Sequence, residues 1–113
     1  MRDDAILEKR ERAMELYEEY GPLLTSSQQR IFESYYRDDL SLSEIAENLA
    51  ISRSAASESL RISWEKLEDL ETKLGEVRYK KAIREQVKAL SSSKEEEQKA
   101  AFIALKELIR HGI

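Results

Sequence analysis

The sequence contains no cysteine, one histidine, one proline and three glycines among its 113 residues. Without cysteine the chain forms no disulfide, no thiolate metal site and no cysteine nucleophile. The single histidine, His111, excludes multi-histidine metal sites and argues against Ser-His-Asp catalysis. Three glycines and one proline leave no phosphate-binding glycine loop and few helix breakers. We therefore expect a mostly helical chain with no metal, no cofactor and no enzymatic activity.

Long apolar runs are also missing. No segment approaches the roughly 20 apolar residues that span a bilayer, and no signal-peptide core follows Met1. We therefore expect a soluble, cytoplasmic protein without membrane insertion. Its 19 basic and 23 acidic residues give a net charge of −4, which argues mildly against tight nucleic-acid binding. A local basic patch remains compatible with that balance.

Capping signals divide the chain into helices. A first helix is expected to begin at Asp3 or Asp4 and to stop at Gly21-Pro22, with Gly21 at the C-cap position. In a capping box, a Ser or Thr and a Glu or Gln three residues later satisfy each other's backbone N–H groups. Such boxes are predicted for Thr25 with Gln28, Ser41 with Glu44, and Ser93 with Glu96. Ser52 is expected to cap a further, long helix. The predicted fold class is all-α.

The segment from Leu42 to Ala56 is typical of a helix-turn-helix whose second helix enters a DNA major groove. The two helices need a small residue where they cross, and Ala46 stands there. They also need apolar residues that lock the angle between them. These are Ile45, Leu49, Ile51, Ala56 and Leu60.

Beyond Ser52 the helical pattern has no breaker until Gly75, which is either a break or a kink. Its apolar positions recur every three or four residues: Ala56, Leu60, Trp64, Leu67, Leu70 and Leu74. Ser91-Ser92-Ser93 is the clearest linker, and the last helix has an apolar face. That face consists of Ala101, Phe102, Leu105, Leu108 and Ile109.

These patterns predict a helix-turn-helix domain with an N-terminal helix over residues 1–74. A C-terminal helical extension is predicted over residues 75–113. The extension offers more apolar surface than a small core can cover, so we predict a homodimer through the C-terminal helices.

The aromatic residues of the first half are spaced as in amphipathic helices. We predict that they form the core and do not stack on bases: Tyr17, Tyr20, Phe32, Tyr35 and Tyr36. Trp64 is predicted to link the recognition helix to the helices packed behind it.

Several short motifs together resemble a known family. They are Leu24-Thr25, Gln29-Arg30, Tyr35-Tyr36, Asp39, Leu42-Ser43, Glu44-Ile45-Ala46, Ser52-Arg53 and Leu67-Glu68. Their layout is similar to sigma-factor region 4, and the whole chain resembles the YlxM family of small bacterial helix-turn-helix proteins. The resemblance is close from about Leu16 to Leu74. It implies a possible role in the signal recognition particle pathway, because genes of this family commonly lie beside those of the particle's GTPase and receptor.

The outward face of the recognition helix is expected to bind nucleic acid. Its candidate residues are Arg53, Ser54, Ser57 and Arg61. The serines are too short to reach deep base edges, and here the sequence departs from the longer side chains that the family tends to carry. Between Ser41 and Trp64, two arginines oppose three glutamates. The alternative is therefore a protein-interaction module that keeps the fold and binds the particle's protein or RNA.

A second basic patch lies further along the chain. Its members are Arg78, Lys80, Lys81, Arg84 and Lys88, with Glu85 as the one acid among them. It could hold RNA phosphates, duplex backbone or an acidic protein. The plainer alternative is a solvated helix face that supports Ile83 and Val87. Upstream acids are expected to pair with this patch across a dimer: Glu65, Glu68, Asp69, Glu71 and Glu76.

Overall fold

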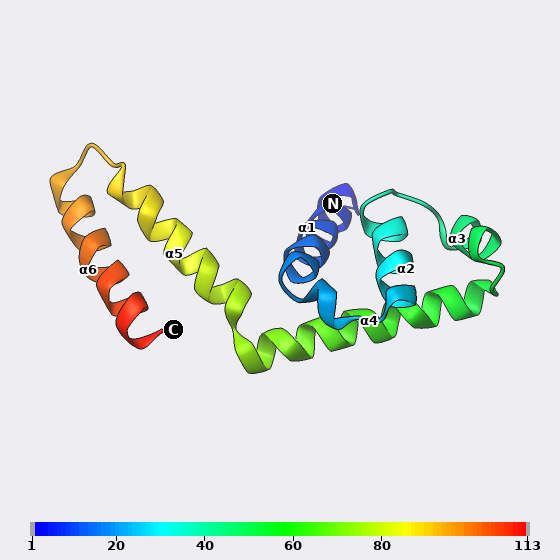
Figure 1. The fold of residues 1–113 in the computed structure, drawn as a ribbon. Helices are drawn as coiled ribbons and strands as arrows, with labels where there is room; N and C mark the ends of the chain where they lie inside the picture. Colours follow the sequence, from blue (N-terminus) through cyan, green and yellow to red (C-terminus); the bar gives the residue numbers. More distant parts are fainter. Residues whose placement is uncertain (1, 113) are drawn as a thin grey trace. The chain divides into compact units, whose positions relative to one another are not determined.

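The computed structural model describes residues 2–112, with side chains described from residue 5 onward. The elements in chain order are α1 (Arg2–Tyr20), the short 3₁₀ helix η1 (Gly21–Leu23), α2 (Ser26–Tyr36), α3 (Leu42–Leu49), α4 (Arg53–Leu74), α5 (Glu76–Leu90) and α6 (Glu95–His111). No strand occurs between residues 2 and 112, and Figure 1 shows the helices joined by short connections. The predicted all-α fold is confirmed. The capping expected of Asp3 or Asp4 falls on side chains outside the described residues.

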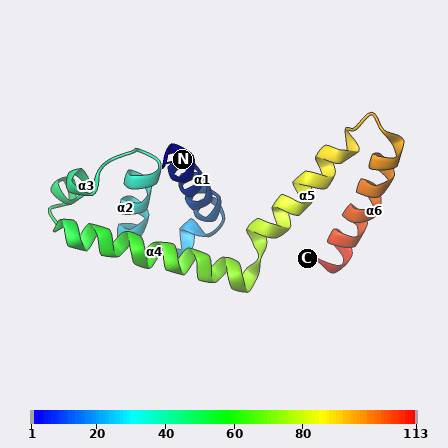
Figure 2. The same cartoon turned by 180° about the vertical axis from the view of Figure 1, so that it is seen from behind.

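The chain divides into two compact units. The first, Met1–Lys73, contains α1 to α3 and nearly all of α4; we call it the helix-turn-helix unit. The second, Leu74–Ile113, contains α5 and α6 running antiparallel side by side, as Figures 1 and 2 both show; we call it the C-terminal hairpin. None of the helices in the described part of the chain combines the length and apolar character that a membrane span requires.

Phe32 lies at the centre of the helix-turn-helix unit and is fully buried. Its ring stacks on Tyr17 from α1 with a centroid separation of 5.1 Å, and it contacts Tyr36 at 4.7 Å and Trp64 from α4 at 6.5 Å. Burying several aromatic rings supplies much of the apolar area that holds a small domain together. The predicted roles of Trp64 as a link and of the tyrosines as core are confirmed, although Tyr35 is only half-buried.

A second apolar cluster fixes the helix-turn-helix itself. Ile31 of α2, Ile45 of α3 and Ala56 of α4 are buried together. Half-buried side chains surround them: Tyr35, Leu40, Leu42, Leu49 and Leu60. Ala56 and Ala46 are buried where α3 approaches α4, so the small residues stand where the helices need close approach.

The local signals of the sequence give mixed results. The capping boxes of Thr25 and Ser41 form as predicted, with both reciprocal hydrogen bonds present. The box at Ser93 is wrong: α6 begins after Lys94 without a side-chain cap. The hydroxyl of Ser92 instead accepts the Lys94 N–H at 3.1 Å and donates to Glu97.

The two internal glycines, Gly21 and Gly75, differ in backbone conformation and in surroundings. Gly75 has φ +64° and separates α4 from α5, so it is a break in the helix. Gly21, expected as a C-cap, begins η1 with a negative φ. A Cβ atom at Gly21 would lie 3.1 Å from the Tyr17 ring, a tight contact that would require the ring to shift by a few tenths of an ångström.

Candidate nucleic-acid interface

The turn between α3 and α4 is built from Ala50, Ile51 and Ser52. Ala50 has a left-handed backbone, with φ 55°, and its N–H reaches the carbonyls that end α3. The Ile51 N–H donates to the Ala46 carbonyl at 3.0 Å. The Ser52 hydroxyl accepts the N–H of Ala55 at 3.0 Å, so the predicted cap of α4 is confirmed. These bonds set the point at which the recognition helix begins.

The first turns of α4 present three of the predicted site residues to solvent. Arg53, Ser54 and Ser57 are exposed, whereas Ala56 between them is buried against α2 and α3. Arg53 forms no ion pair with any residue that the structure describes. The N-terminus of a helix carries a partial positive charge. This end of α4 can therefore attract an anion with a free guanidinium and two short hydroxyls.

Arg61, the fourth predicted residue, is exposed but already paired on its own helix. Its guanidinium bonds to Glu58 one turn before it and to Glu65 one turn after it, the latter at 2.7 Å. The hydrogen bond from Arg61 lowers the pKa of Glu58, and the two carboxylates raise the pKa of Arg61. The three side chains carry a net charge of −1, so this part of α4 does not attract phosphate.

Helix α2 adds residues that the sequence reasoning did not assign to the site. Ser26, Ser27 and Arg30, on the first turns of α2, line a shallow pocket of about 260 Å³ with Leu49 and Ile51 from the end of α3 and the following turn. Arg30 is exposed and has no ion pair among residues 5–112. The spacing of the three residues places them on one polar side of α2, but their approach to the turn depends on tertiary packing.

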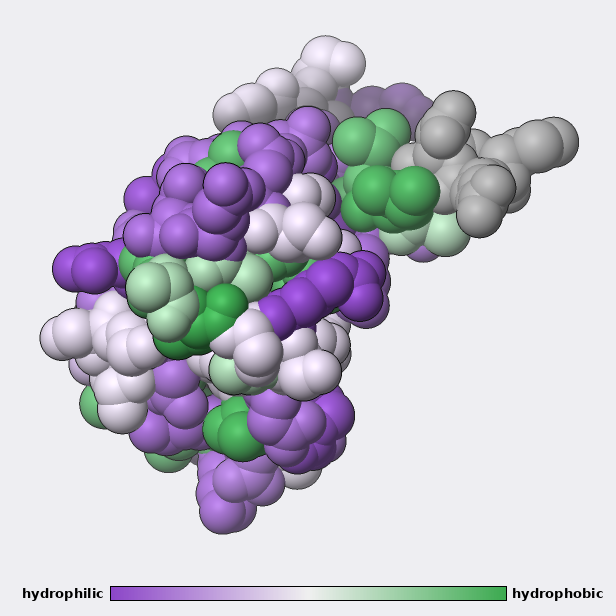
Figure 3. Space-filling model, turned by 90° about the vertical axis from the view of Figure 1, so that its right-hand side faces the viewer, coloured by the Kyte–Doolittle hydropathy of each residue, from purple (hydrophilic) through white to green (hydrophobic). Residues whose placement is uncertain are grey.

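The surface around α3 is mostly hydrophilic. Figure 3 shows the side of the molecule on which α3 lies, and apolar colour there occurs in separate small patches. One larger apolar patch also occurs in this view. Ile6 and Leu7 of α1 are both more than half exposed. Apart from that patch, the residues in this view are mostly hydrophilic.

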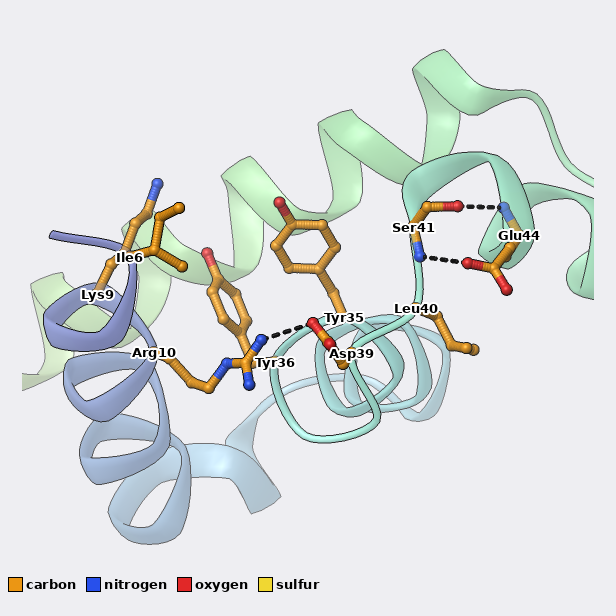
Figure 4. Close-up of a pocket in the computed structure, with 9 residues that line it drawn as sticks. All are labelled: Ile6, Lys9, Arg10, Tyr35, Tyr36, Asp39, Leu40, Ser41 and Glu44. Atoms are coloured by element: carbon orange, nitrogen blue, oxygen red, sulfur yellow. Dashed lines mark hydrogen bonds and ion pairs between the residues drawn. The ribbon is translucent and has the colours of Figure 1, made fainter. Parts of the chain in front are cut away.

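A further pocket of the helix-turn-helix unit lies where α1 meets the loop after α2 (Figure 4). It measures about 500 Å³. Arg10 of α1 pairs with Asp39 of the loop at 2.6 Å, and Glu44 is held in the capping box of Ser41. Lys9 at its edge lies 5.8 Å from the centre of the Trp64 ring. The pocket contains none of the predicted site residues, and its two cations and two carboxylates balance in charge. We interpret it as part of the packing contact between α1 and the loop after α2.

The second basic patch lies on α5 in the C-terminal hairpin. All five of its cations are exposed: Arg78, Lys80, Lys81, Arg84 and Lys88. The acids expected to pair with it across a dimer are engaged inside the helix-turn-helix unit, where Glu65 binds Arg61, Glu68 binds Arg12, Asp69 binds Lys73 and Glu71 accepts from Tyr20. The pairing of these four acids with α5 across a dimer stays a prediction, although each already has a partner within its own unit.

Charge is unevenly divided between the units. Residues 1–73 contain 10 basic and 17 acidic residues, a net charge of −7. Residues 74–113 contain 9 basic and 6 acidic residues, a net charge of +3. The recognition helix therefore belongs to the acidic unit. Any phosphate contact it makes depends on the few cations near its start.

Comparison with known proteins agrees with this geometry. Residues 7–108 match the model of a family described as "Putative helix-turn-helix protein, YlxM / p13 like", UPF0122. The chain belongs to the UPF0122 family. The resemblance noted in the sequence is thus confirmed over both the helix-turn-helix unit and most of the C-terminal hairpin.

Curated UPF0122 proteins are similar over shorter stretches. One from Caldanaerobacter subterraneus is 45% identical over 80 residues, which are 71% of this chain and 66% of that protein. One from Limosilactobacillus reuteri is 47% identical over 68 residues, 60% of each chain. One from a Thermoanaerobacter strain is 49% identical over 63 residues, 56% of this chain and 54% of that protein. The matched segments cover just under two thirds of these relatives or less.

Proposed function

We propose that this UPF0122 protein is a regulatory nucleic-acid-binding protein that holds phosphates at the start of α4. The observation that carries the proposal is Arg53, an exposed guanidinium without an ion pair in the described structure, on the first turn of the recognition helix. Arg30 lines the same pocket as Ile51. Ile51 precedes Arg53 by two residues in the chain, so Arg30 lies close to the start of α4. Ser54 and Ser57 allow the backbone of a nucleic acid to come close, because their side chains are short.

The expected binding is weak and depends on salt. Phosphate neutralisation supplies most of the sequence-independent affinity of nucleic-acid-binding proteins. The unit carries a net charge of −7, and the cations that we place near the turn are Arg53 and Arg30. We therefore expect dissociation constants on the order of 10⁻⁴ to 10⁻⁶ M at physiological salt, as for non-specific binding.

We further propose that the bound nucleic acid belongs to the signal recognition particle system. The support is the resemblance to the YlxM family, whose genes commonly lie beside those of the particle. Crosslinking in cells, followed by identification of both bound nucleic acid and bound protein, tests this step. If neither the particle's RNA nor DNA from its gene region is recovered, the assignment to the signal recognition particle system is contradicted.

A second function is favoured by the acidic character of the helix-turn-helix unit. Arg61 is neutralised by Glu58 and Glu65, and its unit carries a net charge of −7. A module of this kind could bind a basic protein of the particle without specific DNA binding. In the same crosslinking experiment, recovery of the particle's protein alone would favour this second function.

Fluorescence anisotropy with labelled duplex DNA and single-stranded RNA tests nucleic-acid binding directly. Arg53→Ala should weaken binding. Arg37→Ala is the matched control, because Arg37 is also exposed but pairs with Glu33 at the far end of α2. Equal affinities of the wild-type chain and the Arg53→Ala variant would remove Arg53 from the site.

A further inference from the structure

The C-terminal hairpin has a small core for two helices of its length. Ala101 on α6 and Val77 on α5 are buried, but Val77 lies on the side of α5 opposite the half-buried Gln86 and so does not lie between the two helices. One side-chain bond also joins the helices, from the Tyr79 hydroxyl to the Leu108 carbonyl at 3.0 Å. Two helices with so little buried apolar area are not expected to be stable without a further partner.

Large apolar side chains line one face of this hairpin. Phe102 follows the buried Ala101 on α6 and is 58% exposed, and Ile109 is seven residues further on and 73% exposed. Val87 follows the half-buried Gln86 on α5 and is 52% exposed. Each residue is turned by about 100° from the inward-facing residue before it.

These three side chains turn toward the same face. Because α5 and α6 are antiparallel, a rotation in the same sense along each chain leads to the same side of the pair. Half-buried Ile83 and Leu105 lie between them on the two helices. We call this set the apolar stripe: Ile83, Val87, Phe102, Leu105 and Ile109. Ile103 is also exposed, but it is turned by a further 100° and lies off the stripe.

We propose that the apolar stripe binds the same stripe of a second copy of this chain, forming a four-helix bundle. The face is large enough: helices of 15 and 17 residues are about 22 to 25 Å long, and two of them are about 20 Å wide. The flat area of this face is thus about 450 to 500 Å² per copy. Its accessible surface is larger because the side chains make the face uneven. Two copies together reach the roughly 1,000 Å² of a specific interface. The four-helix bundle is the smallest arrangement that covers both stripes.

The charges of the hairpin set how this dimer responds to salt. The hairpin carries a net charge of +3, and Lys80 and Lys106 border the stripe; the Lys106 ammonium lies 5.6 Å from the centre of the Phe102 ring. Glu76 and Glu95 lie on the same face as these lysines and offset their charge locally, but the net charge of +3 on each hairpin still makes two hairpins repel weakly while their apolar side chains attract. Added salt screens the repulsion and should strengthen the dimer. Added salt weakens nucleic-acid binding, so the salt dependence of dimerisation and that of nucleic-acid binding have opposite signs. A failure of this proposal can therefore be distinguished from a failure of the proposed function.

Sedimentation equilibrium of the full chain tests the dimer. The wild-type chain should sediment with twice the mass of one chain at micromolar concentration, and its dissociation constant should fall by a few fold between about 50 and 500 mM salt. Ile109→Glu and Val87→Glu should each raise the dissociation constant at least about tenfold, because a charge then enters the interface. Ile103→Glu is the matched control and should leave it unchanged.

Circular dichroism of each variant shows whether the helices persist. Ile109→Glu decides the question even if Val87→Glu loses helix, because the Ile109 side chain is largely exposed in a single chain. A wild-type chain that stays monomeric up to about 100 μM would overturn the proposal. Equal weakening by Ile103→Glu and Ile109→Glu would overturn the assignment of the stripe.

Discussion

The hydroxyl of Tyr20 donates a hydrogen bond to the Glu71 carboxylate at 2.7 Å, and both side chains are buried. Tyr20 ends α1, and Glu71 lies in the last turn of α4 that belongs to the helix-turn-helix unit. The bond therefore joins two helices that are 51 residues apart in sequence. A hydrogen bond to a charged group in such a place contributes more than one between neutral groups.

Tyr20→Phe removes this donor and keeps the ring. We expect the free energy of unfolding to fall by about 1.5 to 3 kcal/mol, because the buried carboxylate loses a hydrogen bond. Urea titration monitored by circular dichroism measures it. Tyr35→Phe is the control: Tyr35 is only half-buried, and its hydroxyl has no hydrogen-bond partner in the described part of the chain. Equal effects of the two substitutions would show that the Glu71 bond is unimportant.

Ala50 occupies a left-handed backbone position in the turn between α3 and α4. A residue with a Cβ atom is strained there by about 1 to 2 kcal/mol, whereas glycine is not. Glycine loses roughly 0.5 to 1 kcal/mol more chain entropy on folding, so Ala50→Gly should stabilise the protein by about 0 to 1.5 kcal/mol. Ala55→Gly, the same change inside α4, should destabilise it. Thermal unfolding of both variants checks the signs.

Glu58 and Glu65 are predicted to limit nucleic-acid affinity, because they neutralise Arg61 and repel phosphate. Glu58→Gln together with Glu65→Gln should tighten binding by about three- to tenfold at low salt. Asp69→Asn is the control, since Asp69 pairs with Lys73 further along α4. Anisotropy titrations compare the variants. If the Asp69→Asn variant gains as much affinity as the double variant, the effect comes from net charge and not from Arg61.

Arg30 extends the predicted site onto α2. Arg30→Ala should weaken binding by about three- to tenfold for all sequences tested, as expected when one phosphate contact is lost. Arg37→Ala, on the same helix, should have no effect because Arg37 pairs with Glu33. Affinity unchanged by Arg30→Ala would restrict the site to α4.

The parts of this fold that depend on local spacing could be predicted from the sequence. The capping boxes of Thr25 and Ser41 involve residues three apart, and the buried Ala46 and Ala56 follow from the helix-turn-helix pattern. The same local rule was wrong for Ser93, because Ser92 and Glu97 form a competing arrangement.

The electrostatic character of the site was harder to predict. The pairs of Arg61 with Glu58 and Glu65 have the spacing of helix neighbours, so the sequence contained that signal. The pocket shared by Arg30 and Ile51 did not have such a signal, because it depends on how α2 packs on the turn. Likewise, two of the acids upstream of α5 have partners on α1 that are distant in sequence, Arg12 for Glu68 and Tyr20 for Glu71.

The central claim is that Arg53 neutralises a phosphate at the start of the recognition helix. The most direct test is the salt dependence of binding, measured by anisotropy for the wild-type chain and the Arg53→Ala variant from low to physiological salt. Each phosphate neutralised on duplex DNA contributes about 0.9 to the slope of log K against log salt concentration. We predict that Arg53→Ala reduces the steepness of this slope by about 0.9 and weakens binding at low salt. A wild-type chain that does not bind at low salt, or an unchanged slope in the variant, would contradict the claim.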